Sequence, residues 1–196
     1  THGLIGGALI PRLRADGHSE PRNMDMNKTD KKVAIVTGSA TGVGAAAAIL
    51  LAERGCNVVV NYTRSKAEAD ETAAACVAKG AETIVFQADV SDDDACQAMA
   101  KAAADQWGRI DYLVNNAART KFNPYPNWDG VNKQDFLDIY AVNVVGPYQM
   151  IRAVALAQKK YGPGDRRTTL IHGQFITKDQ LDALKDLQVI PSLFPM

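Results

Sequence analysis

Hydrophobic positions between residues 31 and 161 follow two periods that alternate along the chain. Short runs rich in Val and Ile are typical of strands buried on both faces. They predict strands over Val33–Thr37, Asn57–Tyr62, Thr83–Asp89 and Tyr112–Asn116. The longer stretches between them carry Ala, Leu and Ile at helical spacing. They predict helices over Val43–Arg54, Lys66–Lys79 and Ser91–Trp107, and a long helix from about Gln134 to Lys160.

Glycines and capping residues mark where these helices begin and end. Gly55, Gly80 and Gly108 each follow a predicted helix, where glycine commonly ends one. Ser65 stands at the N-cap of the second helix, and Pro147 should kink the long helix because it has no N–H to donate. Strands that alternate with helices form a parallel sheet through right-handed crossovers. The sequence therefore predicts an α/β fold, a three-layer, Rossmann-like, doubly wound parallel sheet.

The two ends of the chain differ from this central part. Residues 1–26 show no sustained period, so we expect a leader or a disordered arm before the Rossmann domain of residues 27–161. Residues 162–196 predict a strand over Thr168–His172, a helix over Lys178–Leu187 and a last apolar run. We expect this segment to pack on the domain, with its first strand replacing the fifth strand of the sheet.

Composition narrows the classes of function. Lys plus Arg and Asp plus Glu both total 22, a balance that gives no reason to expect nucleic acid or an anionic membrane as partner. No apolar run approaches the roughly 18 residues of a membrane-spanning helix. The three cysteines have no metal-binding or redox spacing, which is typical of free thiols in a reducing cytoplasm. The three histidines have no partners near in sequence, so we expect no metal site.

A glycine-rich turn follows the first predicted strand. Gly42, Gly44 and Ala47 form a G-x-G-x-x-A pattern between a strand and a helix, the context that a dinucleotide-binding fingerprint requires. Glycines let the backbone turn tightly and approach a pyrophosphate, whose charge then lies on the free N–H groups of the helix start. The pattern predicts a phosphate loop whose cofactor-binding residues are Gly38, Ser39, Thr41, Gly42, Val43 and Gly44.

The end of the second strand bears on the identity of the cofactor. A site for NAD usually carries Asp or Glu about 20 residues after the glycines, to hold the ribose 2′-hydroxyl. Here that place is Asn61, followed by Arg64 and Ser65. No carboxylate would repel a 2′-phosphate, and Arg64 is available to pair with one. The sequence favours NADP(H) over NAD(H), with these three residues in the site; the alternative is that Arg64 is a solvated charge.

Several motifs together resemble the short-chain dehydrogenases/reductases in type, order and spacing. They are Thr37-Gly38-xxx-Gly42-x-Gly44, Asp89-Val90, Asn115-Asn116-Ala117-Ala118 and Asn143. The resemblance covers residues 31–161 and implies that Asp89 and Val90 lie near the adenine. It implies that Asn116, Ala117 and Ala118 line the cofactor. Asn143 falls where the family keeps a structural and proton-relay asparagine, which makes it a candidate catalytic residue.

The catalytic residues that the family carries after this asparagine are not found. There a Ser orients the substrate carbonyl, and a Tyr-x-x-x-Lys supplies the acid/base tyrosine and the lysine that lowers its pKa. The only tyrosine after Tyr148 is Tyr161, with Asp165 four residues on. Tyr62 and Lys66 have the motif's spacing but lie on the adenosine side. We therefore expect a dehydrogenase truncated before this half, with carbonyl/alcohol redox chemistry impaired or lost.

The tail is similar to another family. Residues 167–192 resemble a fragment of a metal-dependent amidohydrolase, in which the histidine of such a strand binds metal. The remaining metal ligands of that family are absent, so we expect no metal at His172. We interpret the sequence as chimeric, with a dehydrogenase part joined to a foreign tail. If the tail completes the sheet, His172 lies at its carboxyl edge as a candidate acid or base. The alternative is a surface histidine.

Three functions stay open after these observations. The first is an NADP(H)-binding dehydrogenase relative with impaired chemistry, and the second is a non-catalytic nucleotide-binding pseudoenzyme. The third is a hydrolase that uses His172 or an Asp side chain in the cleft. The small-molecule substrate cannot be identified. The family usually associates through the long helix, so we expect a cytoplasmic homo-oligomer with apolar surface at Leu137, Tyr140, Ile151 and Val154.

Overall fold

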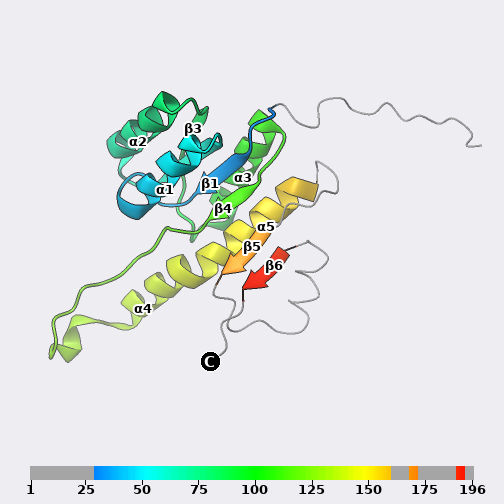
Figure 1. Cartoon of the computed structure of the whole chain (residues 1–196). Coiled ribbons are helices and arrows are strands. Elements are labelled where there is room, and N and C mark those ends of the chain that lie inside the picture. The colour runs from blue at the N-terminus through cyan, green and yellow to red at the C-terminus, as the bar shows by residue number, and fades with distance from the viewer. Residues whose placement is uncertain (1–28, 160–167, 172–188, 193–196) are drawn as a thin grey trace, which may run out of the picture.

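The computed structural model describes residues 29–159, 168–171 and 189–192 (Figure 1). Its main sheet contains β1 (Val33–Val36), β2 (Asn57–Tyr62), β3 (Thr83–Gln87) and β4 (Tyr112–Val114). All pairings in this sheet are parallel, and the strand order is β3-β2-β1-β4. The chain first builds to one side of β1 and then returns to the other side, so the strand order reverses at β1. The predicted doubly wound α/β architecture is confirmed.

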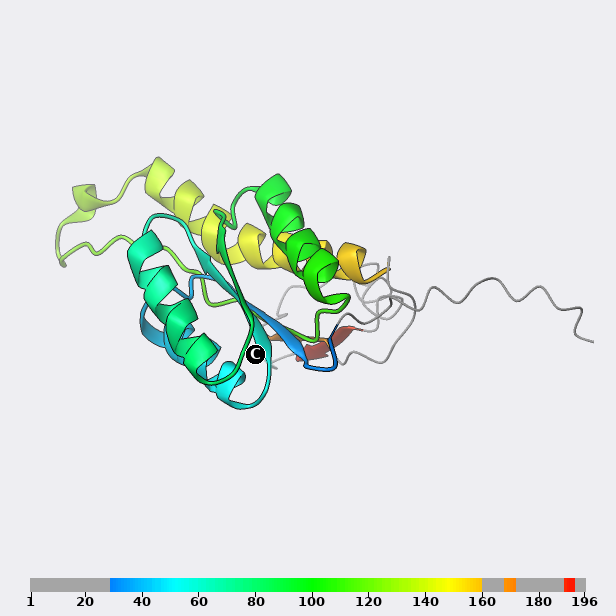
Figure 2. The same ribbon diagram turned by 90° about the horizontal axis from the view of Figure 1, so that it is seen from above.

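Helices cover both faces of this sheet (Figure 2). On one face lie α1 (Gly42–Glu53) and α2 (Lys66–Ala78), and on the other lie α3 (Asp93–Trp107) and α5 (Gly146–Lys159). The observed helices differ from the predicted ones by one or two residues at most ends. None of the described helices is both long and apolar enough to cross a lipid bilayer.

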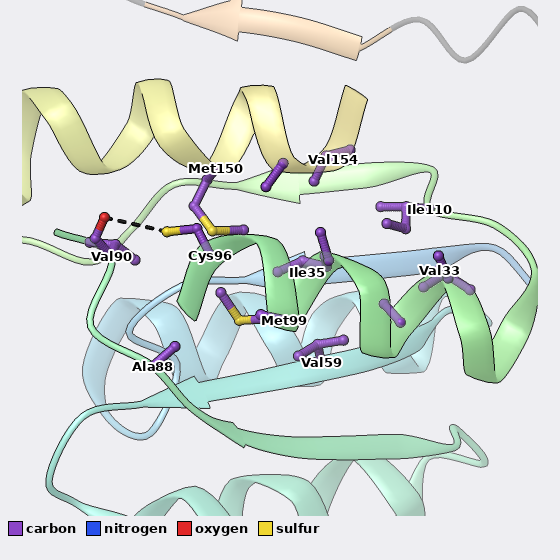
Figure 3. Packing of buried hydrophobic residues seen from close by; sticks show 14 of the residues in the cluster. Val33, Ile35, Val59, Ala88, Val90, Cys96, Met99, Ile110, Met150 and Val154 are labelled. Atoms are coloured by element: carbon purple, nitrogen blue, oxygen red, sulfur yellow. Dashed lines mark hydrogen bonds between the residues drawn. The ribbon is translucent and has the colours of Figure 1, made fainter. Parts of the chain in front are cut away.

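Alternate side chains of the strands belong to two separate hydrophobic cores, one on each face of the sheet. Val33, Ile35 and Val59 pack beneath α3 and α5 (Figure 3), whereas Ala34 and Val58 pack beneath α1 and α2. All five side chains are fully buried. The strands read as continuous apolar runs in the sequence because helices cover both of their faces.

α5 turns one of the residues predicted at the surface toward the sheet. Val154 is only 2% exposed and belongs to the core beneath α3 and α5 (Figure 3). The prediction that Val154 contributes apolar surface for association is therefore wrong. Helical spacing places Leu137 and Tyr140 on the outside instead, with 50% and 59% of their surface exposed.

The start of α3 lies within the run of hydroxyl and carboxylate side chains, residues 91–94, that the sequence places there. Asp92, rather than Ser91, is the N-cap, and its Oδ1 accepts the N–H groups of Asp94 and Ala95 at 3.0 and 3.2 Å. Ser91 instead donates its hydroxyl to Asp89 at 2.7 Å. The helix therefore begins two residues later than the sequence pattern indicated.

The long helix after β4 contains one wider turn. α4 (Lys133–Tyr140) continues into a π-helical turn, η2 (Ala141–Val145), and then into α5. Pro147 has no N–H for the carbonyl of Asn143, and in a regular α-helix its ring would crowd that carbonyl. A π turn accommodates such a local misfit. The predicted irregularity is thus present, but it precedes Pro147 rather than lying at it.

The connection from β4 to α4, which includes the 3₁₀ turn η1 (Trp128–Gly130), projects away from the sheet (Figure 1).

The tail does not extend the main sheet. β5 (Thr168–Ile171) and β6 (Val189–Ser192) pair with each other in parallel and form a second, two-stranded sheet. Among the described strands β5 pairs with β6 and not with β4, so the prediction that Thr168–His172 replaces the fifth strand of the main sheet is wrong. The predicted helix over 178–187 and the arm over 1–26 lie outside the described residues.

Candidate functional site

Three strands deliver the residues of the candidate site to one edge of the main sheet. Thr37 follows β1, Thr63 follows β2 and Asn115 follows β4. Because these strands are parallel neighbours, their carboxyl ends meet at one edge. The strand order reverses at the same edge, and open α/β sheets bind their ligands in the crevice at such a point.

The loop between β1 and α1 turns tightly at two glycines. Gly38 and Gly42 both have a φ of 61°, in the left-handed region that glycine adopts without a Cβ clash. Thr41 and Val43 are exposed, with 79% of the surface of Val43 accessible. The loop therefore presents accessible backbone at the N-terminus of α1, as the predicted phosphate loop requires.

Gly44 is the point where α1 lies closest to its neighbours. A Cβ at this residue would lie 2.4 Å from Nδ2 of Asn116 and 2.5 Å from the carbonyl oxygen of Gly38. A Cβ at Gly38 would lie 2.9 Å from the Cα of Ala117. No side chain fits at either position. Gly38 and Gly44 are therefore required because the start of α1, the loop and the end of β4 pack closely together. Close packing of helix against strand is also the reason for the third glycine of the dinucleotide-binding fingerprint.

Thr37 and Asn116 join the loop to the end of β4. Thr37 is 1% exposed, and its Oγ1 accepts the N–H groups of Asn116 and Ala117, both at 3.0 Å. In return, Nδ2 of Asn116 donates to the carbonyl oxygens of Thr37 and Gly38, also at 3.0 Å. The amide of Asn116 is therefore used to hold the loop. Sequence reasoning quoted Thr37 only as part of a motif and missed this function.

Asn61 does not face the crevice. It is 1% exposed, and its Oδ1 accepts the N–H of Gly38 at 2.9 Å. Its Nδ2 donates to the carbonyl oxygens of Phe86 and Ala88 at 3.2 and 3.0 Å. Ser39 is likewise fully buried, with its hydroxyl bonded to backbone. Both were predicted to contact the cofactor, but their side chains are turned into the sheet, where they bind the loop itself.

Accessible polar groups lie just beyond β2. Thr63 and Arg64 are exposed, and Ser65 is half-buried at the N-cap of α2, where its hydroxyl makes no capping hydrogen bond. Within residues 29–159, Arg64 forms no ion pair. The first turn of α1 contains no acidic residue, and Thr41 makes no side-chain cap there. A helix N-terminus with its N–H groups left open attracts an anion.

Asp89 and Val90 follow β3 on the same edge. Ser91 donates its hydroxyl and its N–H to Oδ1 of Asp89, at 2.7 and 2.9 Å. These hydrogen bonds, assisted by the positive charges of Arg119 and Arg64, lower the pKa of the Asp89 carboxyl. Asp89 is therefore an ionised acceptor at neutral pH. Val90 is buried, with 4% of its surface exposed.

Gly146 is a residue that sequence analysis did not single out. A Cβ at this position would lie 2.7 Å from Cγ2 of Val90, so α5 lies directly against the loop after β3. The available signal was a glycine inside a predicted helix, which destabilises a helix unless close packing requires it.

Asn143 connects the π turn to the loop after β4. Its Oδ1 accepts the N–H of Arg119 at 2.8 Å, and its Nδ2 donates to the carbonyl oxygen of the same residue at 2.9 Å. The guanidinium of Arg119 pairs with Asp138 of α4 at 2.9 Å. The Asn143 side chain thus holds the loop in place. The other predicted catalytic residue, His172, lies outside the described residues.

Among the described ranges, no group of three His, Cys, Asp or Glu residues could hold a metal ion. The predicted loop residues Thr41, Gly42, Val43 and Gly44 gather at the start of α1, and the exposed Arg64 and Ala118 lie at the ends of the strands on either side of β1. The chemistry that this arrangement offers is the binding of an anionic group by backbone N–H groups.

Comparison with known proteins matches this arrangement to one family. Residues 32–165 match the family profile described as short chain dehydrogenase. An uncharacterised oxidoreductase from Methylorubrum extorquens is 41% identical over 139 residues, which are 71% of this chain and 54% of that protein. Versicolorin reductase 1 from Dothistroma septosporum is 37% identical over 66% of this chain and 48% of that protein. The chain spans about half the length of these curated relatives.

A solved structure shows the same fold. A metagenomic short-chain oxidoreductase in complex with NADP superposes with a TM-score of 0.65 at 29% identity, over 83% of this chain and 80% of that one. The amidohydrolase resemblance of residues 167–192 finds no support in these comparisons.

We expect the pKa of Asp89 to lie below its ordinary value of 3.8 and to rise in Ser91→Ala, which removes the hydroxyl donor. Carboxyl NMR during a pH titration measures both values. Because folding favours the ionised form, this group adds stability above its unfolded pKa, and the contribution is lost as pH falls through the lower folded pKa.

Asp135 serves as the internal control in the same titration. Its pKa is lowered by a hydrogen bond from Lys121, far from Ser91 in the sequence. It should therefore titrate alike in both proteins. An Asp89 pKa that is unchanged by Ser91→Ala would contradict the assigned cause.

Proposed function

The chain belongs to the short-chain dehydrogenase family, and we propose that it binds NADP(H) in the crevice at the carboxyl ends of β1, β2 and β4. The observation that carries this proposal is the loop from Gly38 to Gly44. Its close-packed glycines bring the backbone and the start of α1 to the point where strand order reverses. In that position the open N–H groups would hold the pyrophosphate.

The region beyond β2 supports NADP(H) over NAD(H). The residues that end this strand and follow it are Asn61, Tyr62 and Thr63, none of which is acidic, and Asn61 is buried. Arg64 is exposed and can pair with a 2′-phosphate through two parallel N–H donors. A solved relative of similar fold contains NADP. Specificity for the 2′-phosphate would therefore come from Arg64, with the uncapped hydroxyl of Ser65 beside it.

We expect the protein to bind NADP⁺ more tightly than NAD⁺, and Arg64→Ala to weaken NADP⁺ binding about tenfold, because a charge-assisted hydrogen bond is lost. The affinity for NAD⁺ should not change. Arg54→Ala, an exposed arginine at the other end of α1, is the matched control. Isothermal titration calorimetry measures the affinities of the unaltered chain and of both variants for NADP⁺ and for NAD⁺. Absence of binding to the unaltered chain at millimolar NADP⁺ would refute the proposed function.

The same crevice holds few groups that could move a proton. No Tyr-x-x-x-Lys follows β4 in the printed sequence. Asn143, the candidate catalytic residue, has both side-chain amide groups bonded to the backbone of Arg119. We therefore assign Asn143 a positioning task and propose that carbonyl reduction by this chain is impaired or lost.

A panel of aldehydes and ketones tests that second proposal. We expect the 196-residue chain to bind NADPH yet to oxidise it no faster with the panel than without, since general acid catalysis typically supplies about 10²–10⁴-fold in rate. Absorbance at the reduced nicotinamide band reports turnover. A short-chain dehydrogenase of known activity verifies the assay. Substrate-dependent NADPH oxidation that Asn143→Ala abolishes would contradict the proposal and make Asn143 catalytic.

The long helix also supports self-association. Apolar side chains that are about half exposed or more recur every four residues along α4, the π turn and α5, and Leu137 lies next to the first of them; the recurring residues are Phe136, Tyr140, Val144 and Tyr148. A stripe of this kind can pack against its own copy about a twofold axis. We propose that this stripe forms the interface of a homo-oligomer.

We expect a dimer or larger assembly at micromolar concentration in analytical ultracentrifugation. Tyr140→Glu should raise its dissociation constant at least about tenfold, because a charge would be buried without a partner. Val77→Glu introduces the same charge at a half-exposed valine of α2, on the opposite face of the sheet, and should leave the assembly intact. Equal behaviour of the two variants would show that the stripe is not the interface.

A further inference from the structure

We propose that Asn61 is a positioning residue that fixes the phosphate loop for the diphosphate part of the cofactor, which it does not itself touch. The inference rests on the proposed binding of NADP(H). Asn61 is 1% exposed, so its side chain has no path to a bound ligand. Whatever it contributes to binding must therefore pass through the residues it holds.

Two asparagines hold the first glycine of the loop from opposite sides. Oδ1 of Asn61 accepts the N–H of Gly38 at 2.9 Å, and Nδ2 of Asn116 donates to the carbonyl oxygen of Gly38 at 3.0 Å. The two come from β2 and from the end of β4, the neighbours of β1 on either side. Both backbone groups of Gly38 are therefore bound before any ligand arrives, which fixes the direction in which the loop leaves the strand.

Ser39 connects the next residue of the loop to the same asparagine. The N–H of Ser39 donates to the carbonyl oxygen of Asn61 at 2.9 Å, and the N–H of Asn61 donates to the hydroxyl of Ser39 at 3.0 Å. Asn61 thus makes three hydrogen bonds to two successive loop residues. Loss of the side chain would free the N–H of Gly38 but leave its carbonyl oxygen bound to Asn116 and both hydrogen bonds between Asn61 and Ser39 in place. The expected effect is therefore a change in loop position rather than loss of the fold.

The chemistry at this position requires an amide. Nδ2 of Asn61 donates to the carbonyl oxygens of Phe86 and Ala88, at 3.2 and 3.0 Å, while Oδ1 accepts from Gly38. A carboxylate would retain the acceptor but would face those two carbonyl oxygens without a hydrogen to donate. An acid at the end of β2 therefore cannot occupy this inward position. A carboxylate that binds the ribose would therefore have to lie at a later residue of the chain than Asn61.

A preorganised loop benefits only the part of a ligand that rests on it. The diphosphate of NADP⁺ would lie on the loop, whereas adenosine 2′-monophosphate carries the adenosine and the 2′-phosphate but no 5′-phosphate. Removal of the Asn61 side chain should therefore weaken the two ligands unequally. A general loss of stability would weaken them alike, which makes the ratio of the two affinities the decisive quantity.

The experiment compares the unaltered chain, Asn61→Ala, Asn61→Ser and the matched control Asn57→Ala. Asn57 is a fully buried asparagine at the opposite end of β2, and its Oδ1 accepts the N–H of Glu82 at 3.0 Å, away from the loop. We expect Asn61→Ala to raise the Kd of NADP⁺ about tenfold and that of adenosine 2′-monophosphate by less than about twofold. Asn57→Ala should leave the ratio of the two Kd values unchanged.

Hydrogen–deuterium exchange on the ligand-free proteins supplies a second readout. The peptide that spans residues 36–44 should exchange faster in Asn61→Ala and Asn61→Ser than in the unaltered chain, with no change in α3, which the Asn61 side chain does not contact. If the unaltered chain binds neither ligand, the proposed function fails, while the exchange data still decide whether Asn61 positions the loop.

Three results would overturn the inference. One is an equal loss of affinity for both ligands in the Asn61 variants, and another is unchanged loop exchange. The third is the unfolding of both Asn61 variants while Asn57→Ala stays folded, which would make Asn61 a determinant of the fold instead of the loop.

Discussion

The close approach of α1 to its neighbours is the constraint on which the site depends. At Gly44 there is no room for a Cβ between the helix, the carbonyl oxygen of Gly38 and the amide of Asn116. Contact at this distance fixes where the first turn of the helix lies, and with it where its open N–H groups point. Thr37 and Asn116 then tie the loop to β4, so the crevice depends on the β1–β4 pairing. The position of the proposed anion site therefore depends on this one packed junction.

Much of this arrangement could be predicted from the sequence, because the controlling signals are local. The apolar runs of β1 and β2 indicate burial on both faces, and both strands are buried throughout. The spacing of Gly38, Gly42 and Gly44 after a strand indicated the loop correctly. The apolar pattern did not show which face of the sheet each side chain points to. A strand that is apolar on both sides does not show which way its last polar residue points, so Asn61 was expected in the crevice when it lies inside the sheet.

Other differences have the same origin in tertiary structure. Helical spacing showed that Tyr140 and Val154 could both be apolar contact residues, but only packing on the sheet decides that Val154 is buried and Tyr140 exposed. The apolar run over Thr168–Ile171 does form a strand, yet its partner is β6 and not β4. The choice of a strand's partner involves residues far apart in sequence, and propensity carries no information on it.

The structure separates the binding of a dinucleotide from the chemistry done on it. Among the described residues, the side-chain hydrogen bonds that hold the loop between β1 and α1 come from β1, β2, α2 and the end of β4, within residues 36–117. Asn143 and Arg119 lie beyond this set, and they hold the loop after β4 against the π turn through a separate pair of hydrogen bonds. The two sets of hydrogen bonds share no residue, so a change in the second need not loosen the first. For this reason a phosphate loop of the right geometry supports cofactor binding in this chain, whereas redox activity has to be argued from other residues.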